Sequence, residues 1–285
     1  MKILLDDISA NVEITGEGFP VVLLHGAFMN THMWQPQQPL AEKLKLIAID
    51  LRGHGETPCP VNCRSYDRPR DVMQILDALH VEKAVFCGLS MGGPVAIQLA
   101  LDYPQRCLGL VLLATGPGPA DRPMIATQEM KENAEREAQR LLELGPVEYF
   151  YTTPGSNASG VKEFLDQPGY RAVFDHILAQ NDTDYLANTM RLSTLDLPNG
   201  IERLFTAQRT RRLPEINTPV LFMVGSIDIP FSRVAAYLQA TIPHCETEIV
   251  PGASHLINID STGRVIERML EFISSVVAIQ PIVID

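Results

Sequence analysis

The chain has 285 residues, 46% of them hydrophobic, and its 34 acidic and 23 basic side chains give a formal net charge of -11. So much apolar sequence excludes a disordered chain, and the length suits one large α/β domain or one domain with an insertion. The negative charge disfavours nucleic acid or an anionic membrane surface as a partner, because neutralising phosphates requires basic patches.

The first residues form an apolar stretch that is too short for a signal peptide, and no apolar run reaches the ~18 residues of a membrane helix. The 5 cysteines are irregularly spaced, which predicts free thiols in a reducing cytoplasm rather than a disulfide framework. Cys59 and Cys63 lie near His54, but no second ligand pair follows at zinc spacing. We therefore expect no metal site.

Over the first 116 residues, short apolar runs alternate with helical patterns. The runs end at turn residues and are typical of buried parallel strands; they are Val21–Leu24, Leu46–Ile49, Ala84–Cys87 and Leu108–Ala114. Between them, helices are predicted from Asp71 to His80 and from Met91 to Leu101. This alternation predicts a doubly wound, mostly parallel α/β sheet.

Residues 117–212 break the rhythm, because helical patterns follow one another there without a convincing strand. Helices are predicted at Glu129–Leu144, Val161–Leu165, Tyr170–Gln180 and Asp184–Leu195, with a loop from Thr153 to Asn157. Strands resume at Pro219–Val224 and Thr247–Val250, and a last helix is predicted from Ser261 to Ser275. We therefore expect a core made of residues 1–116 and 213–285, with a helical cap inserted at 117–212.

The segment Gly88–Gly93 has the pattern Gly-x-Ser-x-Gly between an apolar strand and an apolar helix. That context predicts a sharp turn that holds the hydroxyl of Ser90 above the sheet, with glycines on both sides to avoid clashes. The N–H of Met91, at the start of the helix, is then placed to face developing negative charge.

A serine hydroxyl is a weak nucleophile and needs a base, which in turn needs an acid to orient it. His255 follows the last predicted strand, and Asp228 follows the strand that ends at Val224. Side chains at the carboxyl ends of parallel strands share one edge of the sheet. The order Ser90, Asp228, His255 therefore predicts a catalytic triad, and Ala27, in the turn after Leu24, a second oxyanion donor.

With these segments, the chain resembles the α/β-hydrolase superfamily, in the branch of esterases, lactonases, cofactor-free haloperoxidase-like enzymes and carbon–carbon bond hydrolases. The matching segments occur in the family's order and are His25–Phe28, Asp50–Gly55, Gly88–Gly93, Gly225–Asp228 and Gly252–His255. The resemblance implies that Ser90 is the nucleophile, His255 the base and Asp228 the orienting acid. It further implies an oxyanion hole at Ala27 and Met91, a cap over the pocket, a structural turn at Asp50–Gly55, and no cofactor or metal.

We expect hydrolysis of a carboxylic ester or lactone of modest size through an acyl-enzyme on Ser90. Phe28 and Met29 flank the site and are expected to contact the substrate. Several alternatives stay open: carbon–carbon bond hydrolysis, perhydrolysis, biosynthetic cyclisation or acyl transfer with the same triad, and a non-catalytic ligand-binding protein on this fold. Each of these functions also involves a small-molecule ligand.

Three further segments allow two interpretations each. Tyr149–Tyr151 either line the cap side of the pocket or pack in a helix core, and the second is favoured. Arg209, Arg211 and Arg212 either hold an anionic group or form a solvated helix end, and again the second is favoured. The apolar stretch Val276–Ile282 is expected to dock on the domain or to contact a second copy of the chain.

Overall fold

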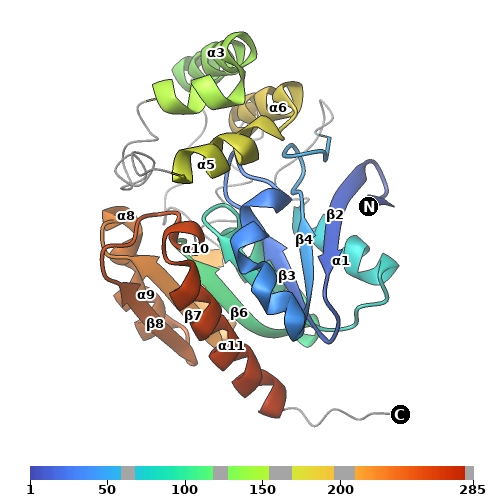
Figure 1. Ribbon diagram of the computed structural model, residues 1–285, viewed down its shortest axis with the longest axis vertical. Helices are drawn as coiled ribbons and strands as arrows, with labels where there is room; N and C mark the ends of the chain where they lie inside the picture. Colours follow the sequence, from blue (N-terminus) through green and yellow to red (C-terminus); the bar gives the residue numbers. More distant parts are fainter. Residues whose placement is uncertain (59–67, 118–127, 154–168, 196–208, 280–285) are drawn as a thin grey trace.

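A single eight-stranded sheet organises the protein (Figure 1), and its strand order is β1-β2-β4-β3-β5-β6-β7-β8. The computed structural model describes residues 1–58, 68–117, 128–153, 169–195 and 209–279. The strands are β1 Lys2–Leu4, β2 Ser9–Thr15, β3 Phe19–Leu24, β4 Leu44–Ile49, β5 Ala84–Leu89, β6 Cys107–Leu113, β7 Val220–Gly225 and β8 Cys245–Val250. All pairs from β4 to β8 are parallel, whereas β2 pairs with β1 and β4 in antiparallel fashion.

The central strands are buried on both faces, which explains their continuous apolar sequences. Every residue of β5 and of β7 is buried. A parallel strand covered by helices on both sides has no solvent face, so its sequence does not alternate. The predicted doubly wound, mostly parallel sheet is confirmed. The antiparallel strands β1 and β2 extend it at one edge and were not predicted from the sequence.

Helices cover the sheet and also stand above it. They are η1 Thr31–Glu42, α1 Arg68–Ala78, α2 Gly92–Asp102, η3 Pro104–Arg106, α3 Gln128–Thr152, α5 Tyr170–Ala179, α6 Thr183–Leu195, η5 Leu213–Glu215, α8 Ile229–Ser232, α9 Val234–Thr241, α10 Ile257–Asp260 and α11 Thr262–Ile279. Helices η1 and α11 contact each other and lie across the front of the sheet in Figure 1. Helix α2 contacts β3, β5 and β6, and also packs against α1.

Helices α3, α5 and α6 form a separate layer above the carboxyl ends of the strands (Figure 1). They lie in the chain between β6 and β7, within the predicted insertion. A small apolar cluster of its own, which includes Ala138, Leu141 and Leu186, joins α3 to α6. The exact limits of the insertion at 117 and 212 stay a prediction. The predicted helix Val161–Leu165 and most of the loop before it lie outside the described residues, as do Cys59 and Cys63.

Helix α3 is bent at Gly145, whose φ of 75° and ψ of 164° lie outside the helical region. The predicted stop at Gly145 and Pro146 is therefore present as a kink. A proline is tolerated at the start of a helical segment, where its missing N–H has no partner to lose. The chain consequently resumes a helix up to Thr152, which the sequence analysis did not foresee.

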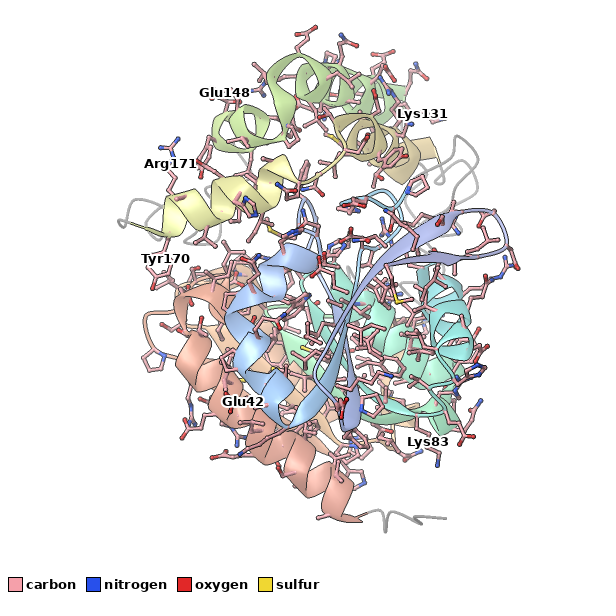
Figure 2. The ribbon with its side chains drawn as sticks, turned by 45° about the vertical axis from the view of Figure 1, so that its right-hand side comes forward. Glu42, Lys83, Lys131, Glu148, Tyr170 and Arg171 are labelled. Atoms are coloured by element: carbon pink, nitrogen blue, oxygen red, sulfur yellow. The ribbon has the colours of Figure 1, made fainter. Side chains whose placement is uncertain are left out.

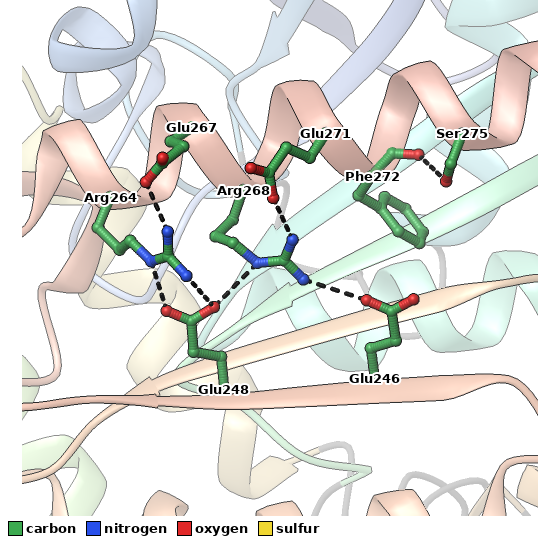
Figure 3. Close-up of polar contacts among 8 residues, drawn as sticks. All are labelled: Glu246, Glu248, Arg264, Glu267, Arg268, Glu271, Phe272 and Ser275. Atoms are coloured by element: carbon green, nitrogen blue, oxygen red, sulfur yellow. Dashed lines mark hydrogen bonds and ion pairs between the residues drawn. The ribbon is translucent and has the colours of Figure 1, made fainter.

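Helix α11 is attached to strand β8 by charged side chains (Figure 3). The carboxylate of Glu248 accepts hydrogen bonds from Nε of Arg264 at 2.6 Å and Nε of Arg268 at 2.9 Å. Arg268 also reaches Glu246 at 3.1 Å. Residues four apart lie on one face of a helix, and residues two apart lie on one face of a strand, so the two periodicities match here.

Farther along α11, apolar side chains pack on the sheet. A Cβ atom at Gly109 of β6 would lie 3.2 Å from the ring of Phe272 and 3.3 Å from Val276. Val276 is only 3% exposed, so the first residue of the predicted apolar tail docks on its own domain. The rest of the tail from residue 280 lies outside the described residues.

Candidate active site

Ser90 occupies a strained turn between β5 and α2. Its φ of 50° lies in the left-handed region, which costs a non-glycine residue about 1–3 kcal/mol. Glycine is required beside it, because a Cβ atom at Gly92 would lie 2.1 Å from the carbonyl oxygen of Leu24. A Cβ atom at Gly88 would lie 2.4 Å from the carbonyl oxygen of Gly92. The predicted nucleophile therefore lies in a sharp turn from strand to helix, and this turn requires glycine at both positions 88 and 92.

The end of strand β6 holds this turn in place. The hydroxyl of Thr115 donates a hydrogen bond of 2.6 Å to the carbonyl oxygen of Ser90, and the N–H of Ser90 donates to Leu113 at 3.0 Å. Ala114 between them has a φ of 45°. Thr115 is completely buried. The sequence analysis missed the role of Thr115 in positioning the serine.

His255 and Asp228 lie together, as predicted. The Nδ1 atom of His255 is 2.7 Å from Oδ2 of Asp228, on the loops that follow β8 and β7. Asp228 is fully buried, and its Oδ1 has no hydrogen-bond partner among the described residues. Nδ1 therefore donates its proton to the carboxylate, which leaves Nε2 as the nitrogen able to accept one. The ring of Phe231 stacks on the imidazole with 5.1 Å between centroids.

The loop that carries His255 has a second carboxylate beneath it. Oδ2 of Asp260 accepts a hydrogen bond of 2.6 Å from the N–H of Ser254, directly before the histidine. The hydroxyl of Ser254 accepts one from the N–H of Leu256 at 3.2 Å. Burial raises the pKa of Asp260 above its usual value. Sequence reasoning missed Asp260, although an acid five residues after the candidate base was visible.

The turn after β3 approaches the nucleophile closely. A Cβ atom at Gly26 would lie 3.5 Å from Cβ of Ser90 and 3.1 Å from the side chain of Leu89. A larger residue at position 26 would therefore fill the space beside Ser90 and press on the side chain of Leu89. Ala27 follows in the turn, and Met91 follows Ser90 at the start of α2. The assignment of their N–H groups to an oxyanion hole stays a prediction that this proximity favours.

Two buried histidines, His25 and His54, lie beside that turn, and His25 forms a hydrogen bond with it. Nε2 of His25 accepts a hydrogen bond of 2.9 Å from the N–H of Leu51, so Nδ1 carries the proton and donates to the carbonyl oxygen of Gly26 at 2.7 Å. Burial lowers the pKa of His25 to about 4 and also lowers that of His54, whose ring lies 5.1 Å away. Both rings are therefore neutral at pH 7 and serve as hydrogen-bonding and packing groups.

Asp50 has a structural role, as the resemblance implied for this segment. Its carboxylate accepts hydrogen bonds from the N–H groups of Thr31 at 2.7 Å and Glu56 at 2.9 Å, and from the amide of Asn11 at 2.9 Å. Three donors satisfy this buried carboxylate, and it ties β2 to the loops after β3 and β4.

Two asparagines fasten the cap to the turn at Ala27. Asn181, between α5 and α6, donates to the carbonyl oxygen of Phe28 at 2.8 Å and accepts from the N–H of Gly55 at 2.8 Å. Asn30 donates to the carbonyl oxygen of Ile177 in α5 at 2.7 Å. Phe28 itself has a φ of 62°. Neither asparagine belongs to a sequence motif, so only the structure identifies them.

A cavity of about 370 Å³ opens between the sheet and the cap, and the predicted nucleophile and base lie on its wall. Its described walls are Gly26, Ala27, Phe28, Met29, Leu89, Ser90, Tyr149, Phe150, Thr153, Phe174, Met190, His255 and Leu256. Ser90 and His255 therefore face the same space, and Phe28 and Met29 line it as expected. Asp228 lies behind His255 rather than on the wall.

For Tyr149–Tyr151 the favoured interpretation holds, because Tyr149 packs in the apolar cluster that joins α3 to α6, and the other interpretation holds as well. Tyr149 and Phe150 lie on the cavity wall, whereas the hydroxyl of Tyr151 points to Asp175 at 2.7 Å. The kinked continuation of α3 brings these rings inward. The charged residues Lys131, Glu148 and Arg171 lie on the outer side of the cap (Figure 2).

The arginines near residue 210 contact protein groups. Arg212 pairs with Asp102 at 2.8 Å and with Glu215 at 3.0 Å. Arg209 donates to the carbonyl oxygen of Pro117 at 2.9 Å. Arg211 is exposed. None of these three lines the cavity, which agrees with the favoured interpretation of a helix end.

Two kinds of feature are absent from the ranges that the structure describes. Within those ranges, no group of three or more His, Cys, Asp or Glu side chains is arranged to hold a metal ion. No helix in the same ranges is long and apolar enough to cross a membrane.

Comparisons with known proteins agree with this architecture. The family profile described as alpha/beta hydrolase fold matches residues 20–262. The chain is 29% identical over 276 residues to 3-oxoadipate enol-lactonase 1 of Acinetobacter baylyi, covering 93% of each chain. It is 29% identical over 264 residues to a candidate 2-succinyl-6-hydroxy-2,4-cyclohexadiene-1-carboxylate synthase of Bacillus subtilis, covering 90% of each. A solved thermophilic esterase from Thermogutta terrifontis, with malate bound, matches with a TM-score of 0.77 at 27% identity, covering 97% of this chain and 98% of that chain.

Proposed function

The chain belongs to the α/β-hydrolase fold family, and from this premise we propose that it is a serine hydrolase that cleaves a carboxylic ester or a lactone. In this proposal Ser90 is the nucleophile, His255 the general base and Asp228 the acid that orients it. Ala27 and Met91 supply the N–H groups of the oxyanion hole. Water is the second substrate, and every other group that the reaction uses belongs to the chain.

The proposed reaction has two steps that mirror each other. The hydroxyl oxygen of Ser90 attacks the carbonyl carbon while Nε2 of His255 takes its proton. The tetrahedral intermediate collapses, the C–O bond of the ester breaks, and the proton passes to the leaving alkoxide. Water then attacks the acyl-enzyme, again losing its proton to Nε2, and the acid leaves as Ser90 regains its hydrogen. A lactone follows the same steps, with the alcohol held in the product chain.

One observation carries this proposal: the hydrogen-bonded pair of His255 and Asp228 shares a cavity with Ser90 on its strained turn. A buried carboxylate at 2.7 Å fixes the tautomer of the imidazole and stabilises the imidazolium that forms. These side chains come from three loops that are far apart in sequence. A turn that merely joins β5 to α2 needs neither the pair nor the cavity.

The relatives favour cleavage at an acyl–oxygen bond. The Acinetobacter baylyi protein is named an enol-lactonase and the Thermogutta terrifontis structure an esterase, and both reactions use an acyl-enzyme chemistry that suits this site. The Bacillus subtilis relative bears the name of a synthase at the same identity. Identity alone therefore does not choose the bond, and the turnover of an ester is the measurement that does.

Covalent labelling and ester turnover test the proposal together. Wild type is treated with an uncharged fluorophosphonate, and intact mass and peptide mapping locate the adduct. We expect one adduct on Ser90 and hydrolysis of 4-nitrophenyl acetate, with both lost in Ser90→Ala and both kept in the control Ser275→Ala on α11. Undiminished ester turnover by purified Ser90→Ala would refute the assignment of the nucleophile.

A further inference from the structure

The cavity wall is unusual in its lack of charge. Its described residues include no Asp, Glu, Lys or Arg. The hydroxyl of Tyr149 donates to Glu137 at 2.9 Å, and the hydroxyl of Thr153 donates to the carbonyl oxygen of Tyr149 at 2.8 Å. Apart from Ser90 and His255, the polar side chains of this wall are thus engaged within the protein. A ligand there meets mainly carbon and sulfur.

The guanidinium group of Arg140, close to this wall, also has its charge and its hydrogen bonds satisfied by protein groups. Arg140 lies over the ring of Tyr149, with its Cζ atom 5.7 Å from the ring centroid. It is 3.6 Å from the carboxylate of Glu137 and donates to the carbonyl oxygen of Thr152 at 2.9 Å. Recognition of a carboxylate in a low-dielectric site needs a paired cation, usually an arginine fork. The described wall does not provide one.

The wall is rich in aromatic rings with fixed positions. Phe28 stacks on Tyr149 at 5.8 Å between centroids, and Phe150 meets Phe174 edge to face at 4.8 Å. An aromatic ring bound in the cavity can therefore make edge and face contacts with them, and these rings lose little conformational entropy on binding because they are already held in place. The flexible side chains of Met29 and Met190 complete the wall and can adapt to its outline. A cavity of about 150 Å³ accepts benzene, so this one of about 370 Å³ holds a ring with a short linker.

We infer that the preferred substrate is an uncharged ester whose acyl part is aromatic, such as an arylacetyl group, and that an acyl part with a free carboxylate is rejected. This inference rests on the proposed function, because it places the acyl group of the Ser90 intermediate in the cavity. Against the described part of the wall, a carboxylate loses its hydration without gaining a paired cation. An aromatic acyl group instead buries only apolar surface against the rings around it, which is favourable.

The test compares 4-nitrophenyl esters that share one leaving group. The acyl parts are phenylacetyl, 4-carbamoylphenylacetyl and 4-carboxyphenylacetyl, and hexanoyl is the linear comparison. The carbamoyl ester matches the carboxy ester in size and differs from it in charge. We expect kcat/KM for the carbamoyl ester to exceed that for the carboxy ester by roughly 100-fold. We expect phenylacetyl to exceed hexanoyl by about 10-fold.

Thr153 allows a matched change of the wall. Thr153→Arg adds a cation at the cavity, and Thr153→Gln adds comparable length without charge. The ratio of carbamoyl to carboxy ester is expected to shrink at least about 10-fold in Thr153→Arg and to persist in Thr153→Gln. A discrimination of less than about 10-fold in wild type, or one that the arginine leaves unchanged, overturns the inference.

Turnover of 4-nitrophenyl acetate separates this result from the proposed function. The acetyl group is too small to depend on the cap wall. Turnover of acetate that requires Ser90, together with equal rates for charged and neutral aromatic acyl groups, refutes the inference alone. Absence of both acetate turnover and labelling of Ser90 refutes the proposed function and the inference with it. A preference for hexanoyl over phenylacetyl refutes the aromatic part.

Discussion

Replacing Asn181 by leucine tests whether the cap positions the catalytic turn. The change keeps the size of the side chain and removes its donor to the carbonyl oxygen of Phe28 and its acceptor for the N–H of Gly55, both at 2.8 Å. Asn181 is 6% exposed, so water does not readily replace these bonds. Each of these two buried groups left without a partner costs about 1–3 kcal/mol, so we expect the free energy of unfolding to fall by about 2–6 kcal/mol.

The same change is expected to lower catalysis. Phe28 is held at a φ of 62°, and Ala27 directly precedes it, so releasing the carbonyl oxygen of Phe28 allows the turn to relax and moves the N–H of Ala27. Complete loss of one oxyanion donor costs about 10²–10³ in kcat, and misplacement should cost at least about 10-fold. KM for a small ester should change less, because the N–H acts mainly in the transition state.

Kinetics and unfolding are measured side by side. kcat and KM for 4-nitrophenyl acetate are determined well below the unfolding midpoint, which is followed by circular dichroism. Val265→Ala in α11 is the matched control, because it removes two buried methyl groups on another element and destabilises without removing a hydrogen bond to the turn. If Asn181→Leu and Val265→Ala show the same kcat, the cap does not position the turn and the reasoning is wrong.

Three further predictions follow from other contacts. Burial lowers the pKa of His25 from 6.5 to about 4, so the unfolded chain binds a proton at a higher pH than the folded chain does. The free energy of unfolding should therefore fall by about 3 kcal/mol between pH 6.5 and pH 4, and His54 acts in the same direction. A free energy of unfolding that does not change over this pH range in urea titrations would contradict the prediction. Gly92→Ala should fail to fold or lose all activity, because its Cβ would meet backbone at 2.1 Å, whereas Gly263→Ala, which meets nothing within 4 Å, should keep full kcat and gain up to about 1 kcal/mol. Thr115→Val removes the 2.6 Å hydrogen bond to Ser90 and should lower kcat about 3- to 10-fold with little change in KM, while Thr115→Ser should restore it; equal kcat in both variants would exclude a positioning role.

The buried strands and most helices were predictable because burial on both faces leaves a plain signature. The runs before Gly88 and Gly225 are entirely apolar, and both are central strands. Strand β2, Ser9–Thr15, was missed because it pairs in antiparallel fashion and includes polar residues that partly face solvent, so it lacks the continuous apolar run by which the other strands were identified. Its residues do alternate strictly between polar and apolar from Ser9 to Thr15, so the pattern of a half-buried strand was present in the sequence and was overlooked.

The site divides along a similar line. Ser90, Asp228 and His255 were predictable because each follows a strong strand, and strand ends share an edge of the sheet. Asn181 and Thr115 were not, since their roles depend on which backbone groups the folded chain brings within reach. Tyr149 packs in the helix cluster as expected, but its additional place on the cavity wall was not favoured, because the kink at Gly145 turns the end of α3 and helical periodicity does not report the direction of a bent helix.

The position of the cap in the chain has a consequence for synthesis. Strands β1 to β6 are complete by Leu113, while β7, which pairs with β6, begins only at Val220. At roughly 5–20 residues per second, a ribosome needs about 5–20 s to add the chain between them. During that interval the edge of β6 stands open to pairing with other strands, a known route to aggregation. The turn of Ser90 can form in this interval, well before the chain contains Asp228 or His255, so a nascent chain holds its nucleophile before it holds the means to activate it.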